Sequence, residues 1–167
     1  MTERFYAKNE AILPVQKGEF LAIVAYHKKA GLLLVKEGMN NHRFQVQSGD
    51  MKNITETIDE KDNVLVQAAR RAIVEEVGKE FLQNFAYYPG HYWKNGPIHT
   101  VLMEYVGDPD DIGQFHPDDH AEIEGYQWFK INHLKNLVAV FNEKRYGQLL
   151  RWVYPALIKV NLGALFW

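Results

Sequence analysis

Gln67-Ala-Ala-Arg-Arg-Ala-Ile-Val-Glu-Glu-Val-Gly78 is the stretch that decides the fold, and it predicts a helix that ends at a glycine. Its alanines and arginines are good helix formers. Gly78 stands where a residue with left-handed backbone commonly closes a helix. The short side chain of Asp62 or Asn63 is expected to cap the start. Apolar side chains recur at helical spacing and predict one buried stripe, made of Val66, Ala69, Ile73 and Val77.

The last turn of this helix carries two adjacent acids, Glu75 and Glu76. Carboxylates are unfavourable there, because the negative end of the helix dipole lies in the same turn and because the two acids repel each other. A divalent cation would remove both costs, since magnesium prefers hard oxygen ligands. The alternative is a solvated acidic turn on a surface helix. The helix alone does not decide between a metal site and an ordinary surface.

Three stretches resemble the Nudix hydrolase family. Arg71–Gly78 resembles the second half of the Nudix box, Gly-x5-Glu-x7-Arg-Glu-U-x-Glu-Glu-x-Gly-U, in which U is aliphatic. Phe44–Asp50 resembles the strand and glycine turn before the box, and Glu122–Phe129 resembles a strand late in the family's fold. The resemblance implies an α/β fold, an α/β/α sandwich with a mixed β-sheet, formed by one domain over residues 1–167.

The chain departs from the box at several positions. Ala72 replaces a glutamate, and Asn63 stands where the earlier glutamate belongs. Arg71 has therefore lost both of the carboxylate neighbours that the family gives it. Thirteen residues separate Gly49 from Asn63 where the family has five, which predicts an insertion of about eight residues. Lys79 stands where an aliphatic residue is usual.

The segment 53–62 is polar and acidic, and it predicts a solvated insertion. An alternative is that one of its acids replaces the carboxylate missing at Ala72 or Asn63. The candidates are Glu56, Asp59, Glu60 and Asp62.

The resemblance implies hydrolysis of a diphosphate linkage in a nucleoside diphosphate derivative, with Mg²⁺ or Mn²⁺ as cofactor. Such an ion neutralises pyrophosphate charge and lowers the pKa of bound water. The implied catalytic residues are Glu75, Glu76 and Arg71. The implied metal ligands are Glu75, Glu76, the carbonyl of Gly49, and Glu122 or Glu124. With Ala72 lacking a carboxylate, we expect Glu76 to be the less replaceable acid, and we expect both acids to lie off the buried stripe.

Two other readings use the same residues differently. Loss of a metal carboxylate is severe where ions share ligands, so the chain could be a catalytically silent Nudix-fold module that binds nucleotides or has a regulatory role. An interaction domain built on exposed aromatic residues is the third reading.

Short runs rich in apolar residues predict strands, and apolar residues at helical spacing predict a pair of C-terminal helices. The strands are Phe20–Tyr26, Leu32–Lys36, Arg43–Gln47, Phe81–Tyr88, His99–Val106 and Tyr126–Ile131, and the helices are His133–Val140 and Glu143–Leu162. Pro89–Pro97 and Gly107–Ala121 are expected to be loops.

The loop Pro89–Pro97 carries aromatic residues that suit a nucleobase. Stacking on aromatic rings contributes about 1–3 kcal/mol per base. The substrate-binding candidates are Tyr92, Trp93 and, before the box, Phe44. The alternative is that Tyr92 and Trp93 cover the core at a hairpin.

Composition limits the remaining classes of function. A formal net charge of -2 supports neither a nucleic-acid partner nor a membrane partner. The absence of cysteine excludes disulfides and cysteine catalysis and fits a reducing compartment. Met1–Glu10 is too polar for a secretory signal, and no apolar run reaches the ~18 residues that span a bilayer. We therefore expect a cytoplasmic protein with a small-molecule substrate. The oligomeric state is left open, with a homodimer as one option.

Overall fold

The computed structural model describes residues 14–37, 51–59, 65–113 and 123–130, together with Val153 and Pro155. Every structural statement below concerns these residues. In chain order the elements are β1 (Phe20–His27), β2 (Gly31–Glu37), β3 (Met51–Lys52), β4 (Ile54–Thr57), α1 (Leu65–Glu76), the 3₁₀ helix η2 (Lys79–Asn84), β5 (Phe85–Asn95), β6 (Ile98–Tyr105), α2 (Pro109–Gly113) and β7 (Ile123–Phe129).

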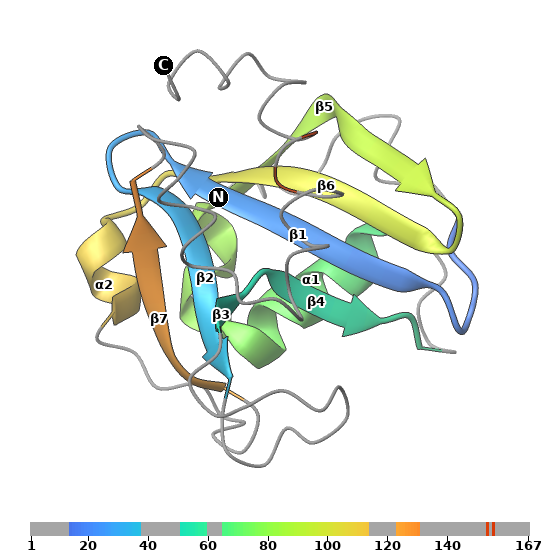
Figure 1. Cartoon of the computed structure of the whole chain (residues 1–167), viewed down its shortest axis with the longest axis horizontal. Coiled ribbons are helices and arrows are strands. Elements are labelled where there is room, and N and C mark those ends of the chain that lie inside the picture. Colours follow the sequence, from blue (N-terminus) through green and yellow to red (C-terminus); the bar gives the residue numbers. More distant parts are fainter. Residues whose placement is uncertain are drawn as a thin grey trace.

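The described strands form one mixed sheet with β1 in its middle (Figure 1). The main path runs β3-β2-β1-β6-β5, while β4 also pairs with β1 and β7 with β2. Strands β1 and β6 are parallel, and the other pairs are antiparallel. The predicted α/β class with a mixed sheet is confirmed.

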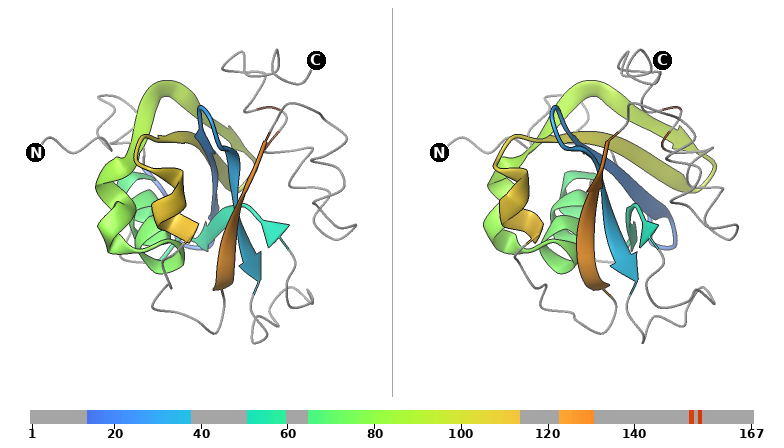
Figure 2. Two further views of the ribbon diagram at one scale, coloured as in Figure 1. Left: turned by 90° about the vertical axis from the view of Figure 1, so that its left-hand side faces the viewer. Right: turned by 60° about the vertical axis from the view of Figure 1, so that its left-hand side comes forward.

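Helix α1 packs on one face of this sheet, on the same side as α2 (Figure 2). Val66, Ala69, Ile73 and Val77 are all buried, which confirms the predicted stripe. Their partners in the core include Ile23, Leu33 and Ile54 from three strands. The helices predicted at His133–Val140 and Glu143–Leu162, and the strand at Arg43–Gln47, lie outside the described residues.

The prediction of a solvated insertion is wrong for residues 54–58. Residues Ile54–Thr57 form β4, which pairs with β1 through contacts such as Ile23↔Ile54. Ile54 and Ile58 are buried in the core. Two isoleucines at this spacing anchor the segment, although most of its other side chains are polar. The chain therefore enters α1 from a strand of the sheet, apart from residues 60–64, which are not described.

The predicted boundaries around β5 also need correction. Residues 81–84 belong to the 3₁₀ helix η2, and β5 continues through most of the predicted loop to Asn95. A register shift between Tyr87 and Tyr92 lets the strand cross that region. The hairpin turns at Gly96, whose φ of 59° favours glycine. Asn95-Gly96 is the hairpin signal in the sequence that identifies this tighter turn.

The remaining predicted loop, Gly107–Ala121, contains the short helix α2. The Asp108 side chain accepts a 3.0 Å hydrogen bond from the Asp110 amide at its start. Within the described ranges, no helix is both long and apolar enough to cross a membrane.

The end of α1 is closed as predicted. Gly78 has a φ of 130°, and the amides of Val77 and Gly78 both donate to the carbonyl of Ile73. Both bonds end on the same carbonyl, so the Gly78 amide shares the acceptor of the regular helical bond from Val77. They also fix the direction in which the last turn presents its two glutamates.

Candidate functional site

Three strands meet the last turn of α1 at Glu76. Lys52, at the end of β3, places its Nζ 2.8 Å from Glu76 Oε1. The Thr55 amide of β4 donates to Glu76 Oε2 at 3.2 Å. The Tyr126 hydroxyl of β7 donates to the Glu76 backbone carbonyl at 2.7 Å. Both carboxylate oxygens of Glu76 therefore have partners within the chain.

Glu76 and Lys52 are buried, with exposed fractions of 6% and 3%. The expectation that Glu76 lies away from the buried side of the helix is wrong. The physical reason is that a carboxylate can be buried when a cation and hydrogen bonds compensate it. The Lys52 ammonium also lies at the helix C-terminus, where the dipole favours positive charge.

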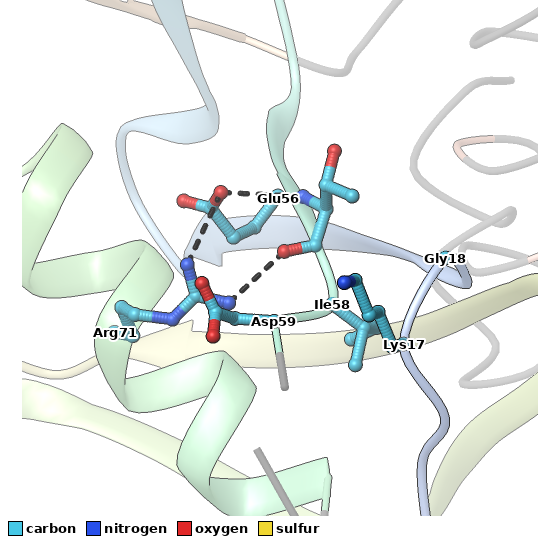
Figure 3. A pocket seen from close by; sticks show the side chains of 7 residues that line it. Lys17, Gly18, Glu56, Ile58, Asp59 and Arg71 are labelled. Carbon is cyan, nitrogen blue, oxygen red and sulfur yellow. Dashed lines mark hydrogen bonds and ion pairs between the residues drawn. The ribbon is translucent and has the colours of Figure 1, made fainter. Parts of the chain in front are cut away.

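Arg71 projects from the middle of α1 towards the end of β4 (Figure 3). Its Nη2 donates to the Thr57 carbonyl at 2.9 Å. Its Nη1 lies 3.4 Å from a Glu56 carboxylate oxygen and 3.9 Å from one of Glu75. In place of the two neighbours that the family gives it, Arg71 therefore has Glu56 and Glu75. Glu56 is one of the four acids that the sequence offered as a replacement carboxylate.

The contact between Arg71 and Thr57 agrees with the residue spacing of the Nudix box when no insertion is assumed. Counted back from Arg71, the pattern places its glutamate at Asn63 and its first glycine at Thr57. The Thr57 carbonyl is the group that Arg71 binds. The box therefore begins at the end of β4, and the insertion inferred from Gly49 is not needed. Gly49 itself lies outside the described residues, so its part in metal binding stays a prediction.

Glu56 and Glu75 lie side by side. Burial, together with a hydrogen bond to the Glu75 carboxyl and the nearby charges of Glu75 and Glu76, raises the pKa of Glu56 to about 8, although Arg71 opposes the shift. Two carboxylates that compete for one proton form an arrangement that a hard cation relieves. Glu56 thus lies beside the box, and Asp59 lines the same cavity, while Glu60 and Asp62 lie outside the described residues.

Two places among the described residues differ in whether their carboxylates already have partners. Glu56 and Glu75 offer adjacent carboxylates, and the Glu75 side chain is half exposed. Glu76 offers no unoccupied carboxylate oxygen. No group of three acidic, histidine or cysteine side chains suited to a metal occurs in the described part of the chain. Glu122 and the Glu124 side chain are not described, so their assignment as ligands stays a prediction.

An open cavity of about 520 Å³ lies beside Arg71 and Glu56 (Figure 3). A volume of this size is in the range of small-molecule sites. Its wall combines cationic and anionic side chains from the segment before β1, the end of β4 and α1. The lining residues are Lys17, Gly18, Glu56, Thr57, Ile58, Asp59 and Arg71.

Tyr92 and Trp93 are consecutive residues of β5, so their side chains point to opposite faces of the sheet. They cannot both stack on one base. Tyr92 packs against the core and stacks on His99, with ring centroids 6.0 Å apart. The position of Tyr92 agrees with the alternative of core cover. Trp93 stays a predicted base contact, and Phe44 lies outside the described residues.

Tyr92 belongs to a polar network that sequence reasoning missed. Its hydroxyl lies 3.0 Å from His99 Nδ1, and His99 Nε2 lies 2.9 Å from Glu19. Lys94 binds the other Glu19 oxygen at 2.8 Å. Burial acts to raise the pKa of Glu19, but these partners outweigh it and lower that pKa to about 2. Glu19 and His99 are 80 residues apart, and no local pattern in the sequence links them.

The fold and the box agree with comparisons to known proteins. A family model described as the NUDIX domain matches residues 18–153. An Ap4A hydrolase from C. elegans, in a binary complex, is 17% identical with a TM-score of 0.53, over 84% of this chain and 98% of that one. A NUDIX hydrolase from Nitrosomonas europaea is 16% identical with a TM-score of 0.50, over 89% and 90%.

A third similar structure is a MutT from work on Aliivibrio salmonicida and Vibrio cholerae. It is 13% identical with a TM-score of 0.51, over 86% of this chain and 99% of that one. At these identities the three structures support the fold alone. A comparison with curated protein sequences gave no match.

Proposed function

Because this chain belongs to the Nudix family, we propose that it hydrolyses a diphosphate linkage in a nucleoside diphosphate derivative with the help of Mg²⁺ or Mn²⁺. One observation carries the proposal. The adjacent carboxylates of Glu56 and Glu75 lie beside Arg71, and Glu56 and Arg71 line an open cavity of about 520 Å³.

In this proposal the residues have separate roles. Glu56 and Glu75 hold the cation, and Arg71 fixes Glu56 and the Thr57 backbone in place. When bound, the cation neutralises diphosphate charge and makes water more acidic. Lys17 contributes positive charge to the cavity that would receive the phosphates. Further ligands proposed from the resemblance are Gly49, Glu122 and Glu124.

The remaining assignments are also proposals. Trp93 and Phe44 are the candidates for contact with the base. The cytoplasmic location is proposed from the cysteine-free sequence.

A second function has a specific observation in its favour. Ala72 lacks the carboxylate of the box, and Glu76 is bound to Lys52. A fold with these two changes could bind a nucleotide without hydrolysing it. This silent module would show saturable binding of a nucleoside diphosphate derivative and no metal-dependent product.

The test is product release from a panel of nucleoside diphosphate derivatives, with Mg²⁺ or Mn²⁺. Ap4A belongs in the panel, because a similar structure is an Ap4A hydrolase. We expect turnover of at least one compound, and we expect Glu75→Gln to reduce it. Glu80→Gln is the matched control, since Glu80 is an exposed acid four residues beyond Glu76 in η2. Binding without turnover would favour the silent module, and neither binding nor turnover would reject both functions.

A further inference from the structure

We propose that the ammonium group of Lys52 replaces a metal ion at Glu76, so that this box carboxylate binds a cation of its own chain. The inference concerns a residue outside the box pattern and is independent of whether the protein hydrolyses anything. It rests on three observations: the partners of the Glu76 carboxylate, the fixed position of Lys52, and the balance of charge between Glu76 and Lys52.

Both carboxylate oxygens of Glu76 have hydrogen-bond partners within the chain. Lys52 Nζ takes one carboxylate oxygen at 2.8 Å, and the Thr55 amide takes the other at 3.2 Å. With only 6% of the residue exposed, solvent has little access to the pair. An ion at Glu76 would have to share its oxygens with these buried partners or displace one of them.

Strand pairing and a further hydrogen bond fix the position of Lys52. Its backbone lies in β3, which pairs with β2 through Val35↔Lys52. Its ammonium also donates to Thr55 Oγ1 at 3.1 Å. A displaced Lys52 would have to leave a buried position or remain as a second positive charge beside the ion. Like charges in a site of low dielectric repel strongly.

The charges of Glu76 and Lys52 balance each other without a metal. In the family's box, acids at the positions of Ala72 and Glu76 would together carry two negative charges. Here Ala72 contributes none, it is fully buried, and it lies one turn before Glu76. The single charge of Glu76 is matched by the single charge of Lys52. The loss of an acid at Ala72 and the presence of Lys52 are therefore complementary changes.

The experiment measures Mn²⁺ binding to the full chain, by the electron paramagnetic resonance signal of free Mn²⁺. In the parent protein, we expect Glu76→Gln to change the apparent Mn²⁺ affinity by less than about 3-fold. We expect Lys52→Met to gain at least about 10-fold in affinity, or an added site, because Glu76 becomes unpaired. The double variant Lys52→Met/Glu76→Gln should lose that gain.

Lys94→Met is the matched control. Lys94 also binds a glutamate at 2.8 Å, but its partner is Glu19, outside the box. The Lys94→Met variant removes one positive charge from the protein, and its Mn²⁺ affinity should equal that of the parent. A general effect of net charge would appear in both lysine variants.

Two results would overturn the inference: loss of Mn²⁺ affinity by 10-fold or more in Glu76→Gln alone, or a Lys52→Met protein that gains no Mn²⁺ binding. If Lys52→Met folds only with Mn²⁺, its melting temperature should rise with Mn²⁺ far more than that of the parent, which supports the inference. If it does not fold at any Mn²⁺ concentration, the comparison of Glu76→Gln with the parent decides. A parent that binds no Mn²⁺ rejects the proposed metal-dependent hydrolysis but leaves the expected gain in Lys52→Met open to measurement.

Discussion

Arg71 donates a 2.9 Å hydrogen bond to the backbone carbonyl of Thr57. This contact ties the helix that carries the box glutamates to the strand that precedes it. It also places Glu56, the neighbour of Thr57, within 3.4 Å of the same guanidinium. Residues 54–58 therefore belong to the sheet and its core, and Glu56 brings a carboxylate beside Arg71.

Arg71→Lys should damage this arrangement. A lysine has one ammonium and cannot reproduce the fork that contacts Thr57 and Glu56 together. We expect kcat/KM to fall by about 10- to 100-fold, a loss of about 1–3 kcal/mol for charged hydrogen bonds. Steady-state kinetics and a melting curve test this expectation. Arg70→Lys is the neighbouring control, and equal losses in both variants would contradict a special role for Arg71.

The two box glutamates should differ in what their loss affects. The sequence ranked Glu76 as the less replaceable acid for catalysis. Its burial and its pairing with Lys52 lead us to propose the opposite order. We expect Glu75→Gln to lower kcat by about 100-fold, as for removal of a charge from a preorganised site. Glu76→Gln should mainly lower the melting temperature. Measured kcat at saturating Mg²⁺ separates the two, and a larger kcat loss in Glu76→Gln would restore the original order.

Lys52→Met should be strongly destabilising without metal. It leaves the Glu76 carboxylate buried without its cation, which typically costs about 3–5 kcal/mol. Urea unfolding in the presence of a chelator measures the change in the free energy of unfolding. Lys94→Met should cost clearly less, because Lys94 is exposed and solvent screens its pair with Glu19. Similar losses in the two variants would show that the burial of Lys52 is not what matters.

Glu19 gives a prediction about pH. Its partners lower its pKa from 4.5 to about 2, so its ionised form stabilises the folded state. That contribution is present above pH 4.5 and is lost as pH falls towards 2. The difference in unfolding free energy between the parent and Glu19→Gln should therefore shrink over this range. Urea titrations at several pH values test it, and a constant difference would contradict the assigned pKa.

Gly18, two residues before β1, and Gly31, the first residue of β2, form a matched pair of glycines. Both have φ near +90°, which strains any other residue by about 1–3 kcal/mol. Only Gly31 also has close backbone neighbours, since an added Cβ would clash with the Phe129 carbonyl of β7. Gly31→Ala should thus lose about 1–3 kcal/mol more than Gly18→Ala. Equal melting temperatures would mean that β7 does not lie against this turn.

The sequence by itself determined the box helix and its surroundings. The spacing of Val66, Ala69, Ile73 and Val77 fixed the buried face of α1, and Gly78 fixed its end. The apolar runs of β1 and β2 also sufficed to predict those strands. These features follow from periodicity and from backbone preferences, which act over a few residues.

Only the tertiary structure decided which charges meet. Lys52 and Glu76 are 24 residues apart, and Arg71 and Thr57 are 14 apart. Their contacts depend on how β3 and β4 pair in the sheet, because the sheet sets which strand reaches the end of α1. The polarity of Glu56 suggested solvent, yet its carboxylate is mostly buried beside Arg71. A pairing between distant residues leaves no periodic trace in the sequence, so packing alone determines it.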